Sequence, residues 1–421
     1  MTILIRQAKI IDPNSPFNGS VQDVLIENGI ISKIGQISPT GNEDIISSPS
    51  LHLSPGWIDI FSHFNDPGLE YKETIETGIA AAAAGGYTEV MLLPNTLPAV
   101  SGKSQVEYII QRSQNACVKV HPMGAVSKQT EGKELAEMYD MHAAGAVAFT
   151  DGLKPLQSAG LLLKALQYVK AFNGTIIQIP DNQTISPGGL MNEGIVSTGL
   201  GLPGKPMIAE EIQVSRDIQL AHYTESSVHF TGITSPNSIE SIQQAKKKGV
   251  AVSCSITPAH LYFSDEDLTG YDTNLKLYPP LRNKETGEFL RQALLNGGID
   301  CIASHHLPHE ADSKECEFES AQPGMISLET AYAVTNSALE GKLSPEKWVE
   351  LVCINPRNIF KLNEPEIKEG ASANLTMFDP SEKTIFTKEH SKSKSKNSPF
   401  FNKELKGKVI ATIHHTHLNK N

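Results

Sequence analysis

The feature that most constrains the fold is a change of hydrophobic pattern near residue 54. From there on, short apolar runs alternate with amphipathic helical stretches, which is typical of βα units and a parallel sheet. We expect strands near residues 57–63, 88–93, 117–122, 146–150, 175–179, 228–232, 250–254 and 299–304. Eight strands with helices between them predict an α/β fold, a (β/α)8 TIM barrel.

The two ends of the chain differ from the middle. Residues 1–53 read as strands and turns, with Glu27-Asn28-Gly29 between two apolar runs as a hairpin signal. The tail from residue 370 is again β-like. We therefore predict one composite β-sandwich domain from residues 1–53 and 370–421, beside a barrel domain of residues 54–369. The Lys/Ser-rich stretch from Lys388 to Lys396 is expected to be a solvated loop.

Bulk properties exclude several classes of protein. The net charge of −11 argues against a nucleic-acid surface, which needs a basic face. No apolar run approaches the roughly 20 residues that span a bilayer, and the N-terminus lacks a signal-peptide layout. We expect a cytoplasmic protein with neither membrane nor nucleic acid as partner. Five scattered cysteines without C-x-x-C spacing predict neither a disulfide framework nor a zinc knuckle.

The stretch from Pro55 to Thr96 carries a specific motif, Asp59-x-Phe61-x-His63-x-Asn65. This frame resembles the start of a dihydroorotase, a cyclic amidohydrolase of pyrimidine synthesis, where the family writes Asp-x-His-x-His-x-Arg. A phenyl ring has no lone pair for a metal, and a carboxamide does not replace a guanidinium fork for binding a carboxylate.

Four later strand ends resemble the same family, each altered at one position. They read Ala148-Phe149-Thr150-Asp151-Gly152, Gln178-Ile179-Pro180-Asp181-Asn182, His229-Phe230-Thr231-Gly232 and Ala303-Ser304-His305-His306-Leu307-Pro308-His309. The resemblance implies that metal-ligand positions are substituted, at Phe61, Ile179, Gly232 and His305. His305 stands where the family has the aspartate that is both ligand and base.

The resemblance also implies a mechanism in which one or two divalent metals generate hydroxide and polarise the ring amide. Phenylalanine, isoleucine and glycine cannot coordinate through their side chains, so only His63, Asp151 and His305 remain as weak candidates. A catalytic zinc generally takes three protein ligands plus water. We therefore expect no two-metal site, and at most one weakly bound zinc as cofactor.

Six further positions match substrate-contacting positions of the family. Asn65 replaces the arginine that would grip the substrate carboxylate, and Tyr278 replaces a substrate-binding asparagine. The predicted substrate pocket consists of Asn65, Asn95, Tyr278, His309, Pro323 and Gly324.

The surviving polar residues also have structural interpretations. His63 is expected to fill the barrel mouth with its ring hydrogen-bonded, and Asp151 to bond local N–H groups. His305 and His306 are adjacent, so they should face opposite ways. Phe61 and Ile179 are expected to pack together.

We predict a dihydroorotase homologue that is catalytically impaired or inactive and has a structural or regulatory role. Its first candidate partner is aspartate carbamoyltransferase, and it is expected to form a homo-oligomer. One alternative is an active dihydroorotase or related cyclic amidohydrolase with an atypical mononuclear or metal-free site, in which His305 and Asp151 are catalytic. Another is a small-molecule binding protein without turnover.

Overall fold

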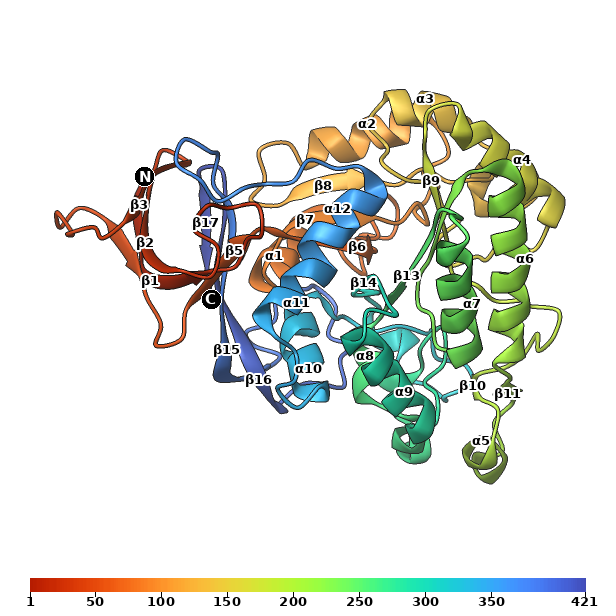
Figure 1. The fold of residues 1–421 in the computed structure, drawn as a ribbon. Helices are drawn as coiled ribbons and strands as arrows, with labels where there is room; N and C mark the ends of the chain where they lie inside the picture. Colours follow the sequence, from red (N-terminus) through yellow and green to blue (C-terminus); the bar gives the residue numbers. More distant parts are fainter.

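A closed ring of parallel strands occupies the middle of the chain in the computed structural model, which describes residues 1–421 (Figure 1). Strands β6, β7 and β8 form one arc, and β9, β12, β13 and β14 form another. Isolated bridges at Phe149 join the two arcs through residues 146–150, and a bridge from Ser62 to His306 closes the ring. The predicted (β/α)8 barrel is confirmed, although its fourth strand is reduced to isolated bridges. The strand bounds are β6 Trp57–Ser62, β7 Tyr87–Leu92, β8 Lys119–Pro122, β9 Thr175–Gln178, β12 Ser227–Phe230, β13 Val252–Ile256 and β14 Cys301–Ile302.

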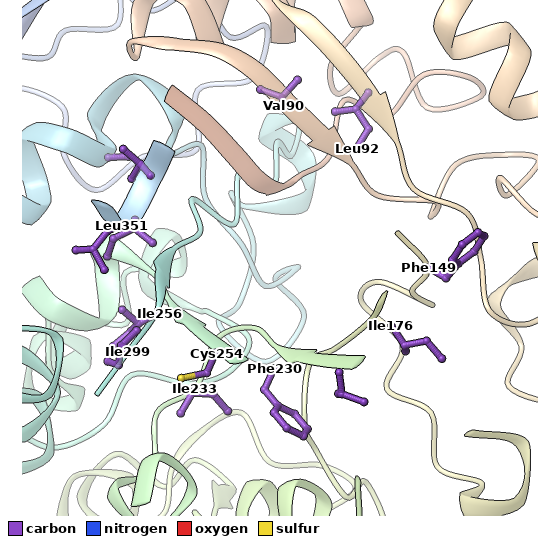
Figure 2. Close-up of a cluster of buried hydrophobic side chains, with 14 of the residues drawn as sticks. Val90, Leu92, Phe149, Ile176, Phe230, Ile233, Cys254, Ile256, Ile299 and Leu351 are labelled. Atoms are coloured by element: carbon purple, nitrogen blue, oxygen red, sulfur yellow. The ribbon is translucent and has the colours of Figure 1, made fainter. Parts of the chain in front are cut away.

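Helices surround the ring, and local sequence decides where several of them begin. Helix α1 starts after Thr74, whose hydroxyl accepts the Thr77 N–H at 3.2 Å. Figure 2 shows part of the apolar layer between strands and helices, with Val90, Leu92 and Phe230 among its buried side chains. The other helices are α2 Lys103–Arg112, α3 Met138–Ala143, α4 Ala159–Lys170, α5 Ile195–Leu200, α6 Ile208–Thr224, α7 Pro236–Lys247, α8 Pro258–Tyr262, α9 Lys284–Leu295, α10 Ala331–Ala338, α11 Pro345–Val349 and α12 Asn355–Phe360; α1 is Ile75–Ala84. None of these helices combines the length and apolar character needed to cross a membrane.

Both chain ends contribute to a single eight-stranded sheet beside the barrel (Figure 1). Strand β5 pairs in parallel with β1 and antiparallel with β15, which joins the first fifty residues to the tail. The predicted hairpin joins β2 and β3, with Asn28 and Gly29 at φ 51° and 80°. A separate apolar cluster fills this β-domain. Its strands are β1 Thr2–Ile10, β2 Val21–Glu27, β3 Ile30–Gly35, β4 Asp44–Ile46, β5 His52–Pro55, β15 Asn374–Ile385, β16 Glu404–His414 and β17 His417–Lys420; β10 (Met191–Asn192) and β11 (Gly204–Lys205) pair separately.

The prediction of a solvated loop from Lys388 to Lys396 is wrong from residue 391 onwards. We call residues 391–398 the strap. Its serines are buried while the lysines between them are exposed. Ser393 donates its hydroxyl proton to the buried carboxylate of Glu73, and the Lys394 N–H donates to the same carboxylate at 2.9 Å. The Ser395 hydroxyl donates to the Lys72 carbonyl at 2.6 Å. The strap therefore ties the tail to the loop that follows β6.

A buried ion cluster connects the N-terminal end of the barrel to α12 and β15. One oxygen of Glu89 lies 2.6 Å from His121 Nε2, while the other accepts from Arg357 at 2.6 Å and from Asn374 at 3.2 Å. Burial alone would raise the pKa of Glu89, but the contacts with His121 and Arg357 hold it well below its ordinary value. The cluster keeps a carboxylate ionised inside the protein.

We expect Arg357→Met to destabilise the protein by about 3–5 kcal/mol, because it leaves the Glu89 carboxylate buried without its arginine partner, which is always charged. Urea unfolding monitored by circular dichroism measures the loss. The double variant E89Q/R357M should recover part of it, since no charge remains to be buried. A single variant as stable as the wild type would contradict the importance of this cluster.

Candidate functional site

The residues at the expected ligand positions lie at or just after the C-terminal ends of barrel strands, where (β/α)8 proteins build their sites. Two of them meet directly: the rings of Phe61 and His305 are stacked, with centroids 4.4 Å apart and planes 29° from parallel. Phe61 and Ile179 belong to one cluster of buried apolar side chains that also contains Met91 and Met123. Apolar contacts thus fill the region where the family resemblance placed a metal.

His305 is held in one orientation by a chain of hydrogen bonds. Its Nε2 lies 2.8 Å from the hydroxyl of Thr231, which accepts from Ser255 at 2.9 Å, and Ser255 in turn lies 3.0 Å from His229 Nε2. The Nδ1 atom of His305 is buried and has no partner. Burial lowers the pKa of His305 to about 3. The ring is therefore neutral near pH 7. Its Nε2, the only ring nitrogen that makes a hydrogen bond, is bonded to Thr231.

Gly232 and His305 fit each other closely. The backbone of Gly232 has φ 70°, a conformation that L side chains rarely adopt. A Cβ atom at this position would lie 3.0 Å from His305 Cε1 and 3.0 Å from Pro279 Cδ. A side chain at 232 therefore conflicts both with its own backbone and with the ring of His305.

Asp151 is used to hold a neighbouring loop. One carboxylate oxygen accepts the N–H groups of Val126 and Ser127 at 3.0 and 2.9 Å, and the other accepts the Ser127 hydroxyl. Burial raises the pKa of Asp151. Asn95 lies beside it, donating from Nδ2 to the Asp151 carbonyl at 3.0 Å and accepting the Leu153 N–H at 3.1 Å. Both side chains thus make local structural bonds, as the structural interpretation of Asp151 expected.

The ring of His63 was expected to be hydrogen-bonded at the barrel mouth, but its Nε2 makes no such bond. This nitrogen is buried without a partner, and burial, aided by the nearby Lys72 and His309, lowers the pKa of His63 to about 3. Asn65, at φ 59°, likewise has a buried side-chain nitrogen with no partner. No three His, Cys, Asp or Glu side chains converge anywhere in the structure in a way that could hold a metal ion. His63, Asp151 and His305 are therefore not brought together as one ligand set.

His306 points away from His305. Its Nδ1 accepts the Ser327 N–H at 3.1 Å, and its Nε2 lies 3.5 Å from the carboxylate of Glu73. The two adjacent histidines thus face different surroundings, as their positions on the chain predicted.

Tyr278 takes part in a buried polar group that sequence reasoning missed. Its hydroxyl donates to Asp181 at 2.8 Å, and Lys205 donates to the same carboxylate oxygen at 2.6 Å. The Lys205 ammonium also lies 5.3 Å from the centre of the Tyr278 ring. Nothing local in the sequence signals this group, because its members lie on three segments that are far apart in the chain.

His309, Pro323 and Gly324 form one corner of the predicted pocket. His309 Nε2 lies 3.1 Å from the Pro323 carbonyl, and the His309 N–H donates to Asn397 of the strap at 3.0 Å. Asn397 also donates to the carbonyls of Leu307 and Gly324, at 3.0 and 3.2 Å. The strap thus fixes the loop on which His309 lies.

Little open volume remains at the barrel mouth. The cavity there measures about 20 Å³ and is lined by residues that include His260, Tyr278, Ser304 and His305. That is room for about one water molecule, whereas ligand pockets usually measure about 300–1,000 Å³. A much larger cleft, about 1130 Å³, lies elsewhere, lined by residues such as Lys119, His121 and His414. None of the predicted site residues lines that cleft, so we assign the site to the mouth.

Comparison with known proteins identifies the family. A family described as "Dihydro-orotase-like" matches residues 51–238. A dihydroorotase of Acetivibrio thermocellus is 40% identical over 414 residues, covering 98% of this chain and 97% of that protein. A dihydroorotase of Syntrophus aciditrophicus is 39% identical over 98% of both chains. The chain belongs to the dihydroorotase family.

Solved structures of other proteins share the fold of this dihydroorotase-family chain. The L-hydantoinase (dihydropyrimidinase) of Arthrobacter aurescens superposes with a TM-score of 0.86 at 23% identity, covering 99% of this chain and 95% of that one. A dihydropyrimidinase of Brevibacillus agri gives a TM-score of 0.80 at 19% identity, with coverage of 99% and 95%. The barrel with an attached β-domain is thus shared with cyclic amidohydrolases.

The fit between Gly232 and His305 predicts a specific pattern of stability. Gly232→Ala should destabilise the protein more than Gly249→Ala, because Gly249 has a similar φ of 80° but nothing within 4 Å of an added Cβ. Each pays about 1–2 kcal/mol for the left-handed backbone, and only the first adds a clash. Denaturant unfolding gives both values. Equal losses would show that the ring of His305 yields without cost.

Two deeply buried neutral histidines predict a loss of stability in acid. The pKa values of His63 and His305 are about 3 in the folded chain, against 6.5 unfolded, so the unfolded chain binds more protons as the pH falls from 6.5 towards 3. We expect stability to fall over that window, and His63→Gln to reduce the slope by about 1.4 kcal/mol per pH unit. Unfolding curves at several pH values test this. The exposed His417→Gln is the control, and a slope that His63→Gln leaves unchanged would contradict the burial of that ring.

Proposed function

We propose that this dihydroorotase-family protein does not hydrolyse dihydroorotate through a paired-metal centre and has instead a structural or regulatory role in pyrimidine synthesis. The observation that carries the proposal is the stack of Phe61 on His305 at the barrel mouth. It fills with apolar contacts the place where the family resemblance requires electron-pair donors.

The chemistry of the remaining donors supports the same conclusion. Asp151 is bonded to Val126 and Ser127, and His305 Nε2 to Thr231, while the unpartnered Nδ1 of His305 does not converge with two further donors. His63 also has an unpartnered Nε2, but these two imidazole nitrogens fall short of the three protein ligands of a catalytic zinc. The residues present do not fit a metal centre.

The residues at the barrel mouth are also poorly suited to bind dihydroorotate. Asn65 lacks the paired donors with which arginine holds a carboxylate, and the Tyr278 hydroxyl is bonded to Asp181. A cavity of about 20 Å³ does not admit a six-membered ring with its carboxylate. Loss of the carboxylate base alone would lower the rate by roughly 10²–10⁴.

A role without catalysis requires a partner, and aspartate carbamoyltransferase is the first we propose to test. The support is the family membership, since that enzyme and dihydroorotase both belong to pyrimidine synthesis, together with a fold kept intact around an altered site. Co-migration of the two purified proteins in gel filtration is the expected result. Independent migration at high micromolar concentrations of both would remove this partner.

For the site itself, we expect protein purified without chelators to contain well under one zinc per chain and to hydrolyse no dihydroorotate above the buffer background. The physical reason is the absence of a convergent donor set. Elemental analysis and a dihydroorotate assay measure the two quantities on the same sample.

The dihydroorotase of Acetivibrio thermocellus, purified and assayed in parallel, is the positive control. Phe61→His should not raise metal content to one zinc per chain, because Ile179 and Gly232 still supply no donor. Stoichiometric zinc with turnover that disappears in His63→Ala and His305→Ala would overturn the proposal in favour of an active enzyme with an atypical site.

A further inference from the structure

The cleft of about 1130 Å³ lies where the barrel meets the β-domain. One wall comes from residues 113–122, which lead into β8, and a second from residues 361–368, which follow α12. The β-domain supplies the third wall, from the start of β15 and the turn between β16 and β17. Ligand pockets favour such junctions between domains and usually measure about 300–1,000 Å³, so this cleft has room for a metabolite.

Two side chains that line this cleft carry buried acceptor atoms without partners. Asn374 on β15 and His414 on β16 are direct partners in the antiparallel register, which places their side chains on the same face of the sheet. The Oδ1 atom of Asn374 and the Nδ1 atom of His414 are both buried and make no hydrogen bond. Folded proteins rarely leave such atoms unsatisfied, so two of them side by side indicate a place for a ligand that brings donors.

The surroundings of the two side chains decide that both atoms are acceptors. Asn374 Nδ2 donates to Glu89 at 3.2 Å, so its Oδ1 is the end that accepts. Burial lowers the pKa of His414 to about 4, which keeps its ring neutral near pH 7, and the Ala116 carbonyl lies close enough to accept the ring proton. Nδ1 of His414 is then an acceptor as well. A ligand that brings two N–H donors to one place therefore satisfies both atoms.

Lys119 is the free positive charge of the cleft. It begins β8, makes no side-chain ion pair or hydrogen bond, and lies near enough to His414 to contribute to the lowered pKa of that ring. The other lysines and carboxylates of the cleft are bonded: Glu89 to Arg357, Lys361 to the Asn173 carbonyl, Glu364 to Asn14, and Glu366 to Lys368. An anionic group of a ligand would therefore find its partner at Lys119.

Two further histidines line the same cleft. His415 and His417 are exposed, and the rings of His414 and His415 have centroids 4.4 Å apart and planes at 61°. Histidine rings are among the surfaces on which nucleic-acid bases stack. The cleft thus combines flat partners for a heterocycle, two adjacent acceptors and one free cation.

We propose that this cleft binds a nucleotide whose base carries an exocyclic amino group, which donates to His414 and Asn374 while the phosphate pairs with Lys119. One amino group supplies two N–H donors and so matches the two adjacent acceptors, whereas an oxo group in its place would face them with a third acceptor. A site built around hydrogen bonds to a ligand rejects the analogue that lacks them. The proposal does not depend on whether catalysis survives, because none of the site residues of the barrel mouth lines the cleft.

The experiment is isothermal titration calorimetry on the full chain with two matched pairs of nucleotides, cytidylate against uridylate and adenylate against inosinate. In each pair the first member has an amino group where the second has an oxo group. We expect cytidylate or adenylate to bind at least roughly tenfold more tightly than its oxo counterpart. The corresponding nucleoside should bind more weakly than the nucleotide, because it lacks the phosphate that pairs with Lys119.

Two variants assign the two ends of the ligand. Lys119→Gln should remove the advantage of the nucleotide over its nucleoside, whereas Lys164→Gln, at an exposed lysine of α4 that also lacks an ion pair, should not. His414→Phe should weaken the amino-bearing nucleotide more than its oxo counterpart. Its control is His52→Phe, because His52 is likewise 8% exposed in the β-domain but lies outside the cleft.

A third variant keeps the test decisive if His414→Phe does not fold, which circular dichroism reveals. Ser372→Trp, at an exposed position that lines the cleft, should obstruct the ligand and abolish binding. Four results would overturn the proposal: no binding of cytidylate or adenylate at about 1 mM, equal affinity within both pairs, displacement by inorganic phosphate as readily as by the nucleotide, or binding that Lys119→Gln and Ser372→Trp leave unchanged.

Discussion

The contact between Phe61 and His305 is the interaction on which the rest of the barrel mouth depends. Because His305 lies against the phenyl ring and is bonded to Thr231, its side chain occupies the space beside Gly232. Position 232 then accepts only glycine without strain. These positions lie at or just after the ends of three different strands, so the alterations form one packing arrangement rather than a set of separate losses.

Family membership and site chemistry point in different directions for this chain. Identity of about 40% over nearly the whole length preserves the barrel, the β-domain and the loop framework. A fold, however, does not specify an activity, which depends on particular groups at particular positions. Here Asp151 and Asn95 are bonded to neighbouring backbone and hydroxyl groups, and Phe61, Ile179 and Gly232 offer no side-chain donor for a metal.

Periodic patterns in the sequence were enough to predict the barrel and the hairpin at Asn28-Gly29, because both depend on local spacing and on glycine at positive φ. The site positions could be named from motifs, but their contacts could not. Asp181, Lys205 and Tyr278 meet from separate segments of the chain, and Ser393 of the strap is satisfied by Glu73, more than three hundred residues earlier. Composition made the strap look solvated, because the carboxylate that makes its burial possible is remote in sequence.

The strap also has a consequence for how the chain matures on the ribosome. Residues 391–398 leave the exit tunnel after every strand and helix of the barrel, yet they supply the partners of Glu73 and His309. Strand β5 must likewise wait for β15 before its edge is paired. A nascent polypeptide therefore carries an unfinished barrel mouth and an open sheet edge until β15 and the strap have followed the whole barrel out of the ribosome.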